Sequence, residues 1–506
     1  MSEKKMRPNV LWLMSDQHNA GCTGYAGHPD VKTPNLDSIA GSGVNFINGF
    51  CNNPICAPSR ICFATGTYMH TSRMFGNDCQ EYGKDARTIA MLFRQYGYQN
   101  ALIGKSHMVR KWDEAGFERI RYTDLCDALY NDPMTTHYFR YLCDHRLGDL
   151  YEEGTPRAEM DYTNDGSKPA KLPYEHSIEH FTGNESLAFL QERDTRRPFF
   201  LKMSFQRPHA PIAPAGEYFN LYDPDRLCLP ASMADWYENG FAGKPDFMRQ
   251  LLEKQIPYPF CVKDEKRLRR VLASYYALIT CIDMEIGRVI DYLKKTGQYE
   301  NTIILYTADH GDFAGEHGLF HKNFGIYESI HRIPFLLKYP GSPAGKKIEG
   351  LAEAVDYFPT LCALCEIPVP EQAEGSSLLP LISGTGSGKN AVFCEWEWPT
   401  AGGKCSAVRT RDYRLVFYGK GKGGELYDRS KDPGEMCNLW NNPEYTARKL
   451  ELLEMLFSFS LEYSVRTGIK TDENNNYQYR MSPSRQLHKM KKYWSDLEKA
   501  YTQERK

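Results

Sequence analysis

The sequence predicts an α/β fold in which a large, mostly parallel sheet carries helices on both faces. A smaller C-terminal domain with a short antiparallel sheet and a helix is expected to follow. Three observations lead to this prediction. Short apolar runs alternate with amphipathic stretches through residues 1–385, as strands and helices do in α/β domains. A break rich in glycine and serine comes next, at residues 383–389. Several β-like runs in close succession then precede a helical stretch.

The elements of the first part can be placed in order. Residues 9–14 are apolar with a polar flank, which is typical of a buried parallel strand. Residues 87–96 have helical spacing and precede a strand at residues 100–103. Residues 264–295 repeat apolar side chains at intervals of three and four, which predicts a long amphipathic helix. Further strands are predicted at residues 198–205, 302–306 and 333–337.

The second part begins after the break. Its predicted strands are residues 391–396, 406–410, 413–418 and 425–427, followed by a helix at 445–463. The charged tail, residues 484–506, is expected to form a surface helix. A chain of 506 residues exceeds the size at which one hydrophobic core stops growing. We therefore expect two domains, residues 1–385 and residues 390–506.

Composition excludes several classes of function. The net charge is −2, so no basic face for nucleic acid or a membrane surface is expected. The start of the chain lacks the apolar stretch of a secretory signal, and no apolar run is long enough to span a membrane. The 15 cysteines are scattered without framework spacing, which indicates reduced thiols and a cytoplasmic protein. Residues 127–186 have poor periodicity and are interpreted as loops, either carrying substrate specificity or forming an irregular surface excursion.

Two pairs of polar residues follow predicted strands. Asp16 and Gln17 come just after the first strand, and Asp309 and His310 come just after the strand at residues 302–306. In open α/β sheets, ligands collect outside the carboxyl ends of the strands. Oxygen-bearing side chains there could hold a hard cation, although an Asp after a strand is more often a helix cap or turn former. Two such pairs together favour a single metal site.

The most specific pattern is Cys56-Ala57-Pro58-Ser59-Arg60, completed by Thr65 and Gly66. It resembles the signature of the sulfatase family, C-x-P-S-R-x-x-x-x-T-G, at every defined position. The plainer alternative is a buried free cysteine beside a proline turn.

The resemblance extends along most of the chain. Other segments resemble the family in the same order: Pro8-Asn9-Val10 leading to Asp16; Thr33-Pro34-Asn35-Leu36-Asp37; Gly104-Lys105-Ser106-His107; Pro208-His209 with Pro211; Asp309-His310-Gly311; Gly315-Glu316-His317-Gly318 with Lys322; Val355-Asp356; Leu426-Tyr427-Asp428; Asp432-Pro433; and Asn438-Leu439.

The resemblance implies a mechanism and a role for each residue. In the family a maturation enzyme, the maturase, oxidises the cysteine to formylglycine (3-oxoalanine), so Cys56 would be the precursor of the nucleophile. Asp16, Gln17, Asp309 and His310 would hold a divalent metal that also binds residue 56. Arg60 would stabilise the formylglycine, and Lys105 and Lys322 would contact sulfate oxygens. His107 would help to eliminate sulfate. His209 would either act as an acid that protonates the leaving alcohol or bind the ester oxygen. His317 and His321 are further candidates beside the metal ligands or the substrate.

One departure bears on the metal. Many family members carry Asp-Asp at the first ligand pair and Asp-Asn at the second, whereas this chain has Asp16-Gln17 and Asp309-His310. These versions resemble choline sulfatases, some glycan sulfatases and phosphonate monoester hydrolases. Calcium, the family default, prefers oxygen ligands, and manganese accepts an imidazole readily. Both metals therefore remain candidates.

The function expected from the resemblance is hydrolysis of a sulfate monoester. The chain has 33 tyrosines and 7 tryptophans, which suits a carbohydrate sulfate whose sugar faces stack on aromatic rings, and also an aryl sulfate. A small sulfated sugar or oligosaccharide is favoured, ahead of an aryl or choline sulfate. The alternatives are a phosphonate monoester or phosphodiester hydrolase on the same scaffold, a non-catalytic protein that binds sulfated glycans, and a hydrolase that uses the unmodified Cys56 thiol. The oligomeric state is open, a homo-oligomer included.

Overall fold

The computed structural model describes residues 7–72, 74, 76–77, 86–108, 110–124, 133–151, 167–253, 260–261, 264–322, 324–398, 403–464, 469–471 and 477–479. The chain divides into two compact units, Met1–Leu452 and Leu453–Lys506. Both of the sheets predicted from the sequence lie in the first unit, and the predicted division between residues 385 and 390 stays a prediction. The surface helix predicted at residues 484–506 lies outside the described residues.

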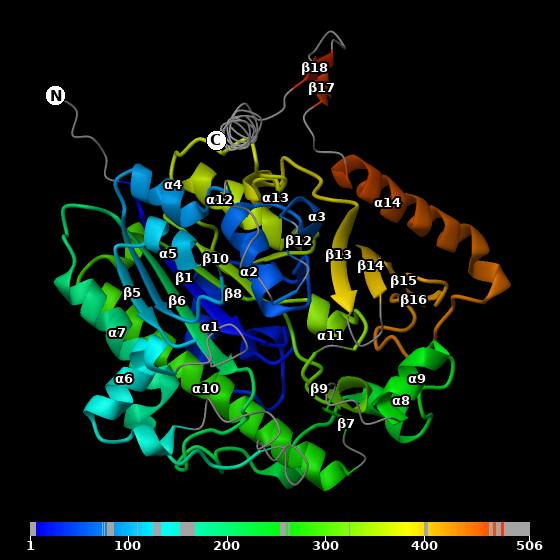
Figure 1. Ribbon diagram of the computed structural model, residues 1–506, viewed down its shortest axis with the longest axis horizontal. Coiled ribbons are helices and arrows are strands. Elements are labelled where there is room, and N and C mark those ends of the chain that lie inside the picture. Colours follow the sequence, from blue (N-terminus) through cyan, green and yellow to red (C-terminus); the bar gives the residue numbers. More distant parts are fainter. Residues whose placement is uncertain are drawn as a thin grey trace, which may run out of the picture. The chain divides into compact units, whose positions relative to one another are not determined.

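An eight-stranded sheet forms the centre of the first unit, and it confirms the predicted α/β architecture (Figure 1). Its strands, in spatial order, are β11 (Lys346–Ile348), β2 (Val44–Phe46), β10 (Phe335–Lys338), β8 (Thr302–Ala308), β1 (Asn9–Asp16), β6 (Phe199–Pro208), β4 (Gln99–Gly104) and β5 (Arg119–Tyr122). Strands β8, β1, β6, β4 and β5 pair in parallel, and β10 runs antiparallel to both of its neighbours. The parallel strands therefore end at one edge of the sheet.

Successive side chains of β1 point to opposite faces of the sheet, and helices cover both faces. Leu11 and Leu13 join the core cluster formed with helices α1 (Pro34–Ser42), α7 (Ile178–Glu192) and α10 (Glu265–Lys295). Trp12 points to the opposite face, where its ring centroid lies 6.1 Å from that of Phe63 in helix α2 (Cys56–Thr65). Helices α4 (Ile89–Gln95) and α12 (Tyr357–Leu364) complete that face. Both sides are buried, as the continuous apolar run of β1 predicts.

The second sheet confirms the predicted C-terminal strands. β13 (Ala391–Trp398), β14 (Gly403–Thr410), β15 (Tyr413–Tyr418) and β16 (Gly424–Asp428) pair antiparallel in sequence order. The predicted helix is α14 (Thr446–Ser464). Cys394 and Val416 of this sheet pack in one core cluster with Phe313 and Phe324, which follow β8.

The interpretation of residues 127–186 as loops was wrong in part. The described residues there include helix α6 (His137–Asp144) and the beginning of α7. The side chains of Thr136 and Ser177 each accept a backbone N–H at the helix start, which is the ordinary N-cap contact. Helix α6 buries only Tyr138 and Leu142, so its apolar pattern is too short to be recognised as a period.

The remaining elements are short. They are α3 (Met69–Ser72), α5 (Arg110–Gly116), α8 (Ala234–Tyr237), α9 (Asp246–Glu253), α11 (Glu328–His331), α13 (Leu379–Ser383), β3 (Gly49–Phe50), β7 (Phe260–Cys261), β9 (Leu319–Phe320), β12 (Ala352–Glu353), β17 (Ile469–Thr471) and β18 (Tyr477–Tyr479). Within the described part of the chain, no helix combines the length and apolar composition that a membrane crossing requires.

Candidate active site

The two predicted ligand pairs lie side by side because their strands are neighbours. β1 and β8 pair in parallel register, with Ser15 opposite Ala308, so Asp16 and Asp309 leave adjacent strand ends. The backbone N–H of Gln17 donates to Oδ1 of Asp309 at 3.0 Å. Asp16, Gln17, Asp309 and His310 are all buried. The structure thus brings the four residues together as the strand positions suggested.

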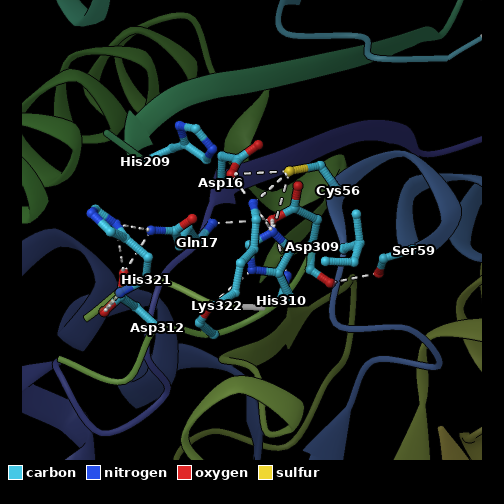
Figure 2. Close-up of polar contacts among 12 residues, drawn as sticks. Asp16, Gln17, Cys56, Ser59, His209, Asp309, His310, Asp312, His321 and Lys322 are labelled. Carbon is cyan, nitrogen blue, oxygen red and sulfur yellow. Dashed lines mark hydrogen bonds and ion pairs between the residues drawn. The ribbon is translucent and has the colours of Figure 1, made fainter. Parts of the chain in front are cut away.

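A metal fits this cluster by the chemistry of its donors. Asp16, Cys56, Asp309 and His310 each offer one ligand atom, and these atoms lie within 4.8 Å of one another (Figure 2). Nδ1 of His310 lies 2.8 Å from the carbonyl oxygen of Gly311, to which it donates, so the lone pair is on Nε2. Two carboxylates, a sulfur and an oriented imidazole are a suitable donor set for a divalent cation.

Cys56 occupies the first position of helix α2, whose ten residues are all buried. The positive end of the helix dipole therefore faces the ligand cluster. Sγ of Cys56 lies 3.3 Å from Nε2 of His310 and 2.8 Å from Nζ of Lys322. Burial and the Asp16 carboxylate would raise the pKa of the Cys56 thiol, but Lys322, Lys105 and His310 outweigh them and hold it well below its ordinary value.

Arg60 lies one turn further along α2 and contacts both carboxylates. Its Nε is 2.8 Å from Oδ2 of Asp309, and one terminal nitrogen is 3.1 Å from Oδ2 of Asp16. The other terminal nitrogen donates to Oγ of Ser204 at 2.9 Å and to the Lys105 carbonyl at 3.1 Å. The guanidinium is fully buried and holds the two acidic residues in place.

The segment after β4 supplies a second cation. Nζ of Lys105 lies 2.7 Å from Oδ2 of Asp16. Burial would raise the pKa of Asp16, but the surrounding cations, Lys105 foremost, hold it well below its ordinary value. Gly104 is required here: its φ is +106°, and a Cβ would lie 1.8 Å from the carbonyl oxygen of Ser204. His107 follows with a φ of +50°, and its buried side chain belongs to the same segment.

His209 follows β6 and lies over Asp16 in Figure 2. Its Nδ1 donates to the carbonyl oxygen of Ala210 at 2.7 Å, which leaves Nε2 for other partners. Burial and the nearby Lys322 lower the pKa of His209 well below its ordinary value, so the imidazole is neutral at pH 7. The two peptide bonds flanking this segment, Arg207–Pro208 and Ala210–Pro211, are cis.

The two further histidines have different surroundings. Nδ1 of His321 lies 3.0 Å from Nε2 of Gln17, so His321 is adjacent to the metal-ligand candidates. Nδ1 of His317 lies 2.8 Å from Oδ2 of Asp235, a residue of helix α8. The structure therefore places His321, but not His317, beside Gln17.

Four residues of the site were missed by sequence reasoning. Ser204 accepts from Arg60, and Asn77 accepts the backbone N–H of Ala57 through Oδ1 at 3.2 Å. Asp124 accepts the backbone N–H groups of Ser106 and His107 at 3.2 and 2.7 Å. Asp312 accepts from Gln17, and burial raises its pKa to about 7. Asp124 carried a usable signal, because it lies just beyond the carboxyl end of the parallel strand β5, and Asp16 lies at that end of β1.

Comparison with known proteins agrees with the geometry. The sulfatase family model matches residues 8–367, and a model for the C-terminal part of N-sulphoglucosamine sulphohydrolase matches residues 315–461. The chain is 33% identical over 460 residues to an arylsulfatase of Clostridium perfringens, covering 88% of this chain and 92% of that protein. It is 27% identical over 520 residues to an N-acetylglucosamine-6-O-sulfatase of Bacteroides thetaiotaomicron, covering 91% and 88%.

Among solved structures, the chain is similar to the phosphonate monoester hydrolase SpPMH of Silicibacter pomeroyi, with a TM-score of 0.76 and 22% identity. The match covers 94% of this chain and 100% of that one, and it concerns the fold alone. The family model spans most of the chain, and its match includes every candidate site residue. The chain therefore belongs to the sulfatase family and is a sulfuric ester hydrolase.

Proposed function

We propose that the protein cleaves a sulfate monoester with a formylglycine at position 56 and one divalent metal. The observation that carries the proposal is the position of Cys56. It lies at the buried start of α2, within 4.8 Å of ligand atoms of Asp16, Asp309 and His310, and 2.8 Å from Lys322. A nucleophile at this point would stand between a bound cation and an ammonium group, both of which stabilise developing negative charge.

The metal would be held by Asp16, Gln17, residue 56, Asp309 and His310. A bound divalent cation would lower the pKa of a hydroxyl on residue 56 and neutralise sulfate oxygens. Calcium is the first candidate because carboxylate and amide oxygens are hard ligands. The imidazole of His310 supports manganese as the second.

The hydrated aldehyde of formylglycine supplies one hydroxyl that attacks sulfur and a second whose deprotonation releases sulfate and restores the aldehyde. Lys105 and Lys322 would bind the sulfate oxygens, since each places an ammonium beside the ligand cluster. His209 is neutral with its proton on Nδ1, so it would first take up a proton on Nε2 when the anionic sulfate ester binds beside it. It would then donate that proton to the ester oxygen as the alcohol leaves. His107 would take part in sulfate release, and Arg60 would keep both carboxylates in position.

A carbohydrate sulfate is the proposed substrate class. The similarity to an N-acetylglucosamine-6-O-sulfatase supports it over about nine tenths of each chain. A small sulfated sugar or oligosaccharide fits best. A formylglycine-generating maturase would be the partner that prepares Cys56, because the Cys56-Ala57-Pro58-Ser59-Arg60 sequence is the pattern associated with that conversion.

A second candidate function is hydrolysis of phosphonate monoesters or phosphodiesters. It is favoured by the pair Gln17 and His310 and by the similarity in fold to a phosphonate monoester hydrolase. A panel of sulfate monoesters, phosphate diesters and phosphonate monoesters separates the two. The second function is correct if kcat/KM for a phosphorus ester exceeds that for every sulfate ester.

Mass spectrometry tests the proposed nucleophile directly. The protein is produced with a maturase and digested with trypsin, which releases the peptide at residues 33–60, containing Cys51 and Cys56. Conversion of Cys56 should make this peptide about 18 Da lighter, with fragmentation placing the change at position 56. A residue 56 that stays a thiol in protein from its native host would refute the formylglycine mechanism.

A further inference from the structure

The side-chain nitrogen of Gln17 contacts two neighbouring side chains. Nε2 lies 2.6 Å from Oδ2 of Asp312 and 3.0 Å from Nδ1 of His321. All three side chains are buried, and Figure 2 shows the nitrogen of Gln17 facing Asp312 and His321. The carbonyl oxygen is consequently turned to the other side of the amide, the side of Asp16.

Asp312 is itself held in a fixed orientation. Its Oδ1 accepts the backbone N–H of Ala314 at 2.7 Å and that of His321 at 3.1 Å. Its backbone carbonyl accepts from Nδ2 of Asn19 at 2.7 Å. Oδ1 is thereby committed to the backbone, and Oδ2 is the atom presented to Gln17. These contacts fix the plane of the carboxylate, so that one of its oxygens always faces Gln17.

These contacts decide which end of the amide faces the metal-ligand cluster. An amide has a donor end and an acceptor end of nearly the same size, and only the oxygen binds a cation. When the Asp312 carboxyl is ionised, a reversed amide would place its oxygen against Oδ2 of Asp312, and two acceptors at this distance repel. His321 adds to the preference because Nδ1 can accept from the nitrogen and has no proton to give when its tautomer is Nε2–H.

We propose that Asp312 and His321 are positioning residues that hold the Gln17 carbonyl oxygen toward the divalent metal. The inference rests on the proposed function, since it assumes that a metal binds there. Asp312 and His321 would act through Gln17, without contacting the metal or the substrate themselves. Partners that orient a metal ligand in this way commonly change metal affinity by roughly 10- to 100-fold when they are replaced.

The sharpest test is the isosteric variant Asp312→Asn. The Asn oxygen would take over the two backbone N–H groups, so that its NH2 group would point at Gln17. Gln17 would then turn its oxygen to that donor and its nitrogen to the metal. Isothermal titration of the metal-free protein with Mn²⁺ and with Ca²⁺ at pH 8 should show Kd raised by roughly 10- to 100-fold.

A compensating change gives a prediction that a merely structural role would not. In the double variant Gln17→Glu with Asp312→Asn, one glutamate oxygen accepts from the new amide and the other faces the metal. We expect Kd for Mn²⁺ to return to within a few-fold of the wild-type value. His321→Ala should weaken binding, and His321→Asn should restore it, because Oδ1 of Asn can accept where Nδ1 of His did.

A matched control is Asp283→Asn. Asp283 of α10 is equally buried and accepts the backbone N–H groups of Asn35 and Leu36 in α1 at 3.1 and 2.8 Å. It should lower the melting temperature and leave Kd unchanged. Wild-type Kd values in both Asp312→Asn and His321→Ala would overturn the inference. A wild-type protein that binds neither metal would instead refute the proposed metal site.

Discussion

Nζ of Lys322 lies 2.8 Å from Sγ of Cys56 and at the same distance from Nε2 of His310. One ammonium group therefore contacts both the candidate nucleophile and a candidate metal ligand. Lys322 follows strand β9 and Cys56 begins α2, so the contact joins two segments that are distant in the sequence. In protein without formylglycine, the ammonium stabilises the Cys56 thiolate.

Replacing Lys322 should raise the pKa of the unconverted thiol. In protein produced without a maturase, Lys322→Met removes a positive charge 2.8 Å from sulfur, which makes the thiolate less stable. The pH midpoint for alkylation of Cys56 by iodoacetamide, followed on the peptide at residues 33–60, should move upward. The exposed Lys347→Met variant is the control and should keep the wild-type midpoint. An unchanged midpoint in Lys322→Met would contradict the electrostatic role.

Arg60→Lys should lower both activity and stability. A single ammonium cannot replace the guanidinium contacts to Asp16, Asp309 and Ser204. Leaving a buried charge without its partner lowers the free energy of unfolding by about 3–5 kcal/mol. The loss in Arg60→Lys should be smaller, because the Lys ammonium keeps the positive charge. We expect kcat/KM to fall by roughly 10- to 100-fold, by analogy with other partners of metal ligands.

The control for this variant is the extent of formylglycine formation, because Arg60 belongs to the motif. Activity is therefore expressed per converted site, counted by mass spectrometry. The Ser204→Ala variant removes only one hydrogen bond to Arg60 and should lower stability by about 1 kcal/mol. Wild-type activity per converted site in Arg60→Lys would show that the two carboxylates do not need the guanidinium.

Asp124 should act on the segment that carries Lys105 and His107. Its carboxylate accepts the N–H groups of Ser106 and His107, so removing it releases the backbone between the two candidate catalytic side chains. We expect Asp124→Ala to lower kcat by up to about 100-fold, because displacing a catalytic group by about 1 Å can cost that much. The kcat of Asp124→Asn should fall less, because the amide oxygen of Asn can still accept one N–H. An equal fall of kcat in the two variants, or a change in KM with kcat unaltered, would argue against a positioning role for Asp124.

Stability should fall as pH drops from 6.5 toward 4 because of His18. Burial lowers the pKa of His18 to about 4, so the folded protein keeps it neutral while the unfolded chain takes up a proton. This contribution is complete above pH 6.5 and is lost progressively below it, by roughly 2 kcal/mol at pH 5. Thermal melts at pH 7 and pH 5 should differ less for His18→Gln than for the wild type.

The exposed His145→Gln variant is the comparison for that experiment. It should keep the wild-type difference between the two pH values. A His18→Gln variant with the full wild-type difference would show that His18 is not the group responsible.

Much of the fold could be predicted because the relevant patterns are local. The apolar run of β1 and the spacing of apolar residues at three and four in α10 can each be recognised within a short stretch of sequence. The ends of predicted parallel strands then indicate where ligand-binding residues lie. The sequence therefore indicates Asp16 and Asp309 as candidate ligands. Helix α6 was missed because its two buried residues do not make a period.

The sequence by itself determined the family signature around Cys56, the order of the strands along the chain and the residue types available as ligands. Tertiary structure alone decided which cationic side chain contacts which anionic one, and that the side-chain nitrogen of Gln17 faces Asp312. Gln17 and Asp312 are 295 positions apart, and their contact exists because β1 and β8 pair in parallel and end at one edge. Local sequence sets backbone conformation, whereas hydrogen bonds between distant side chains depend on packing that no short pattern records.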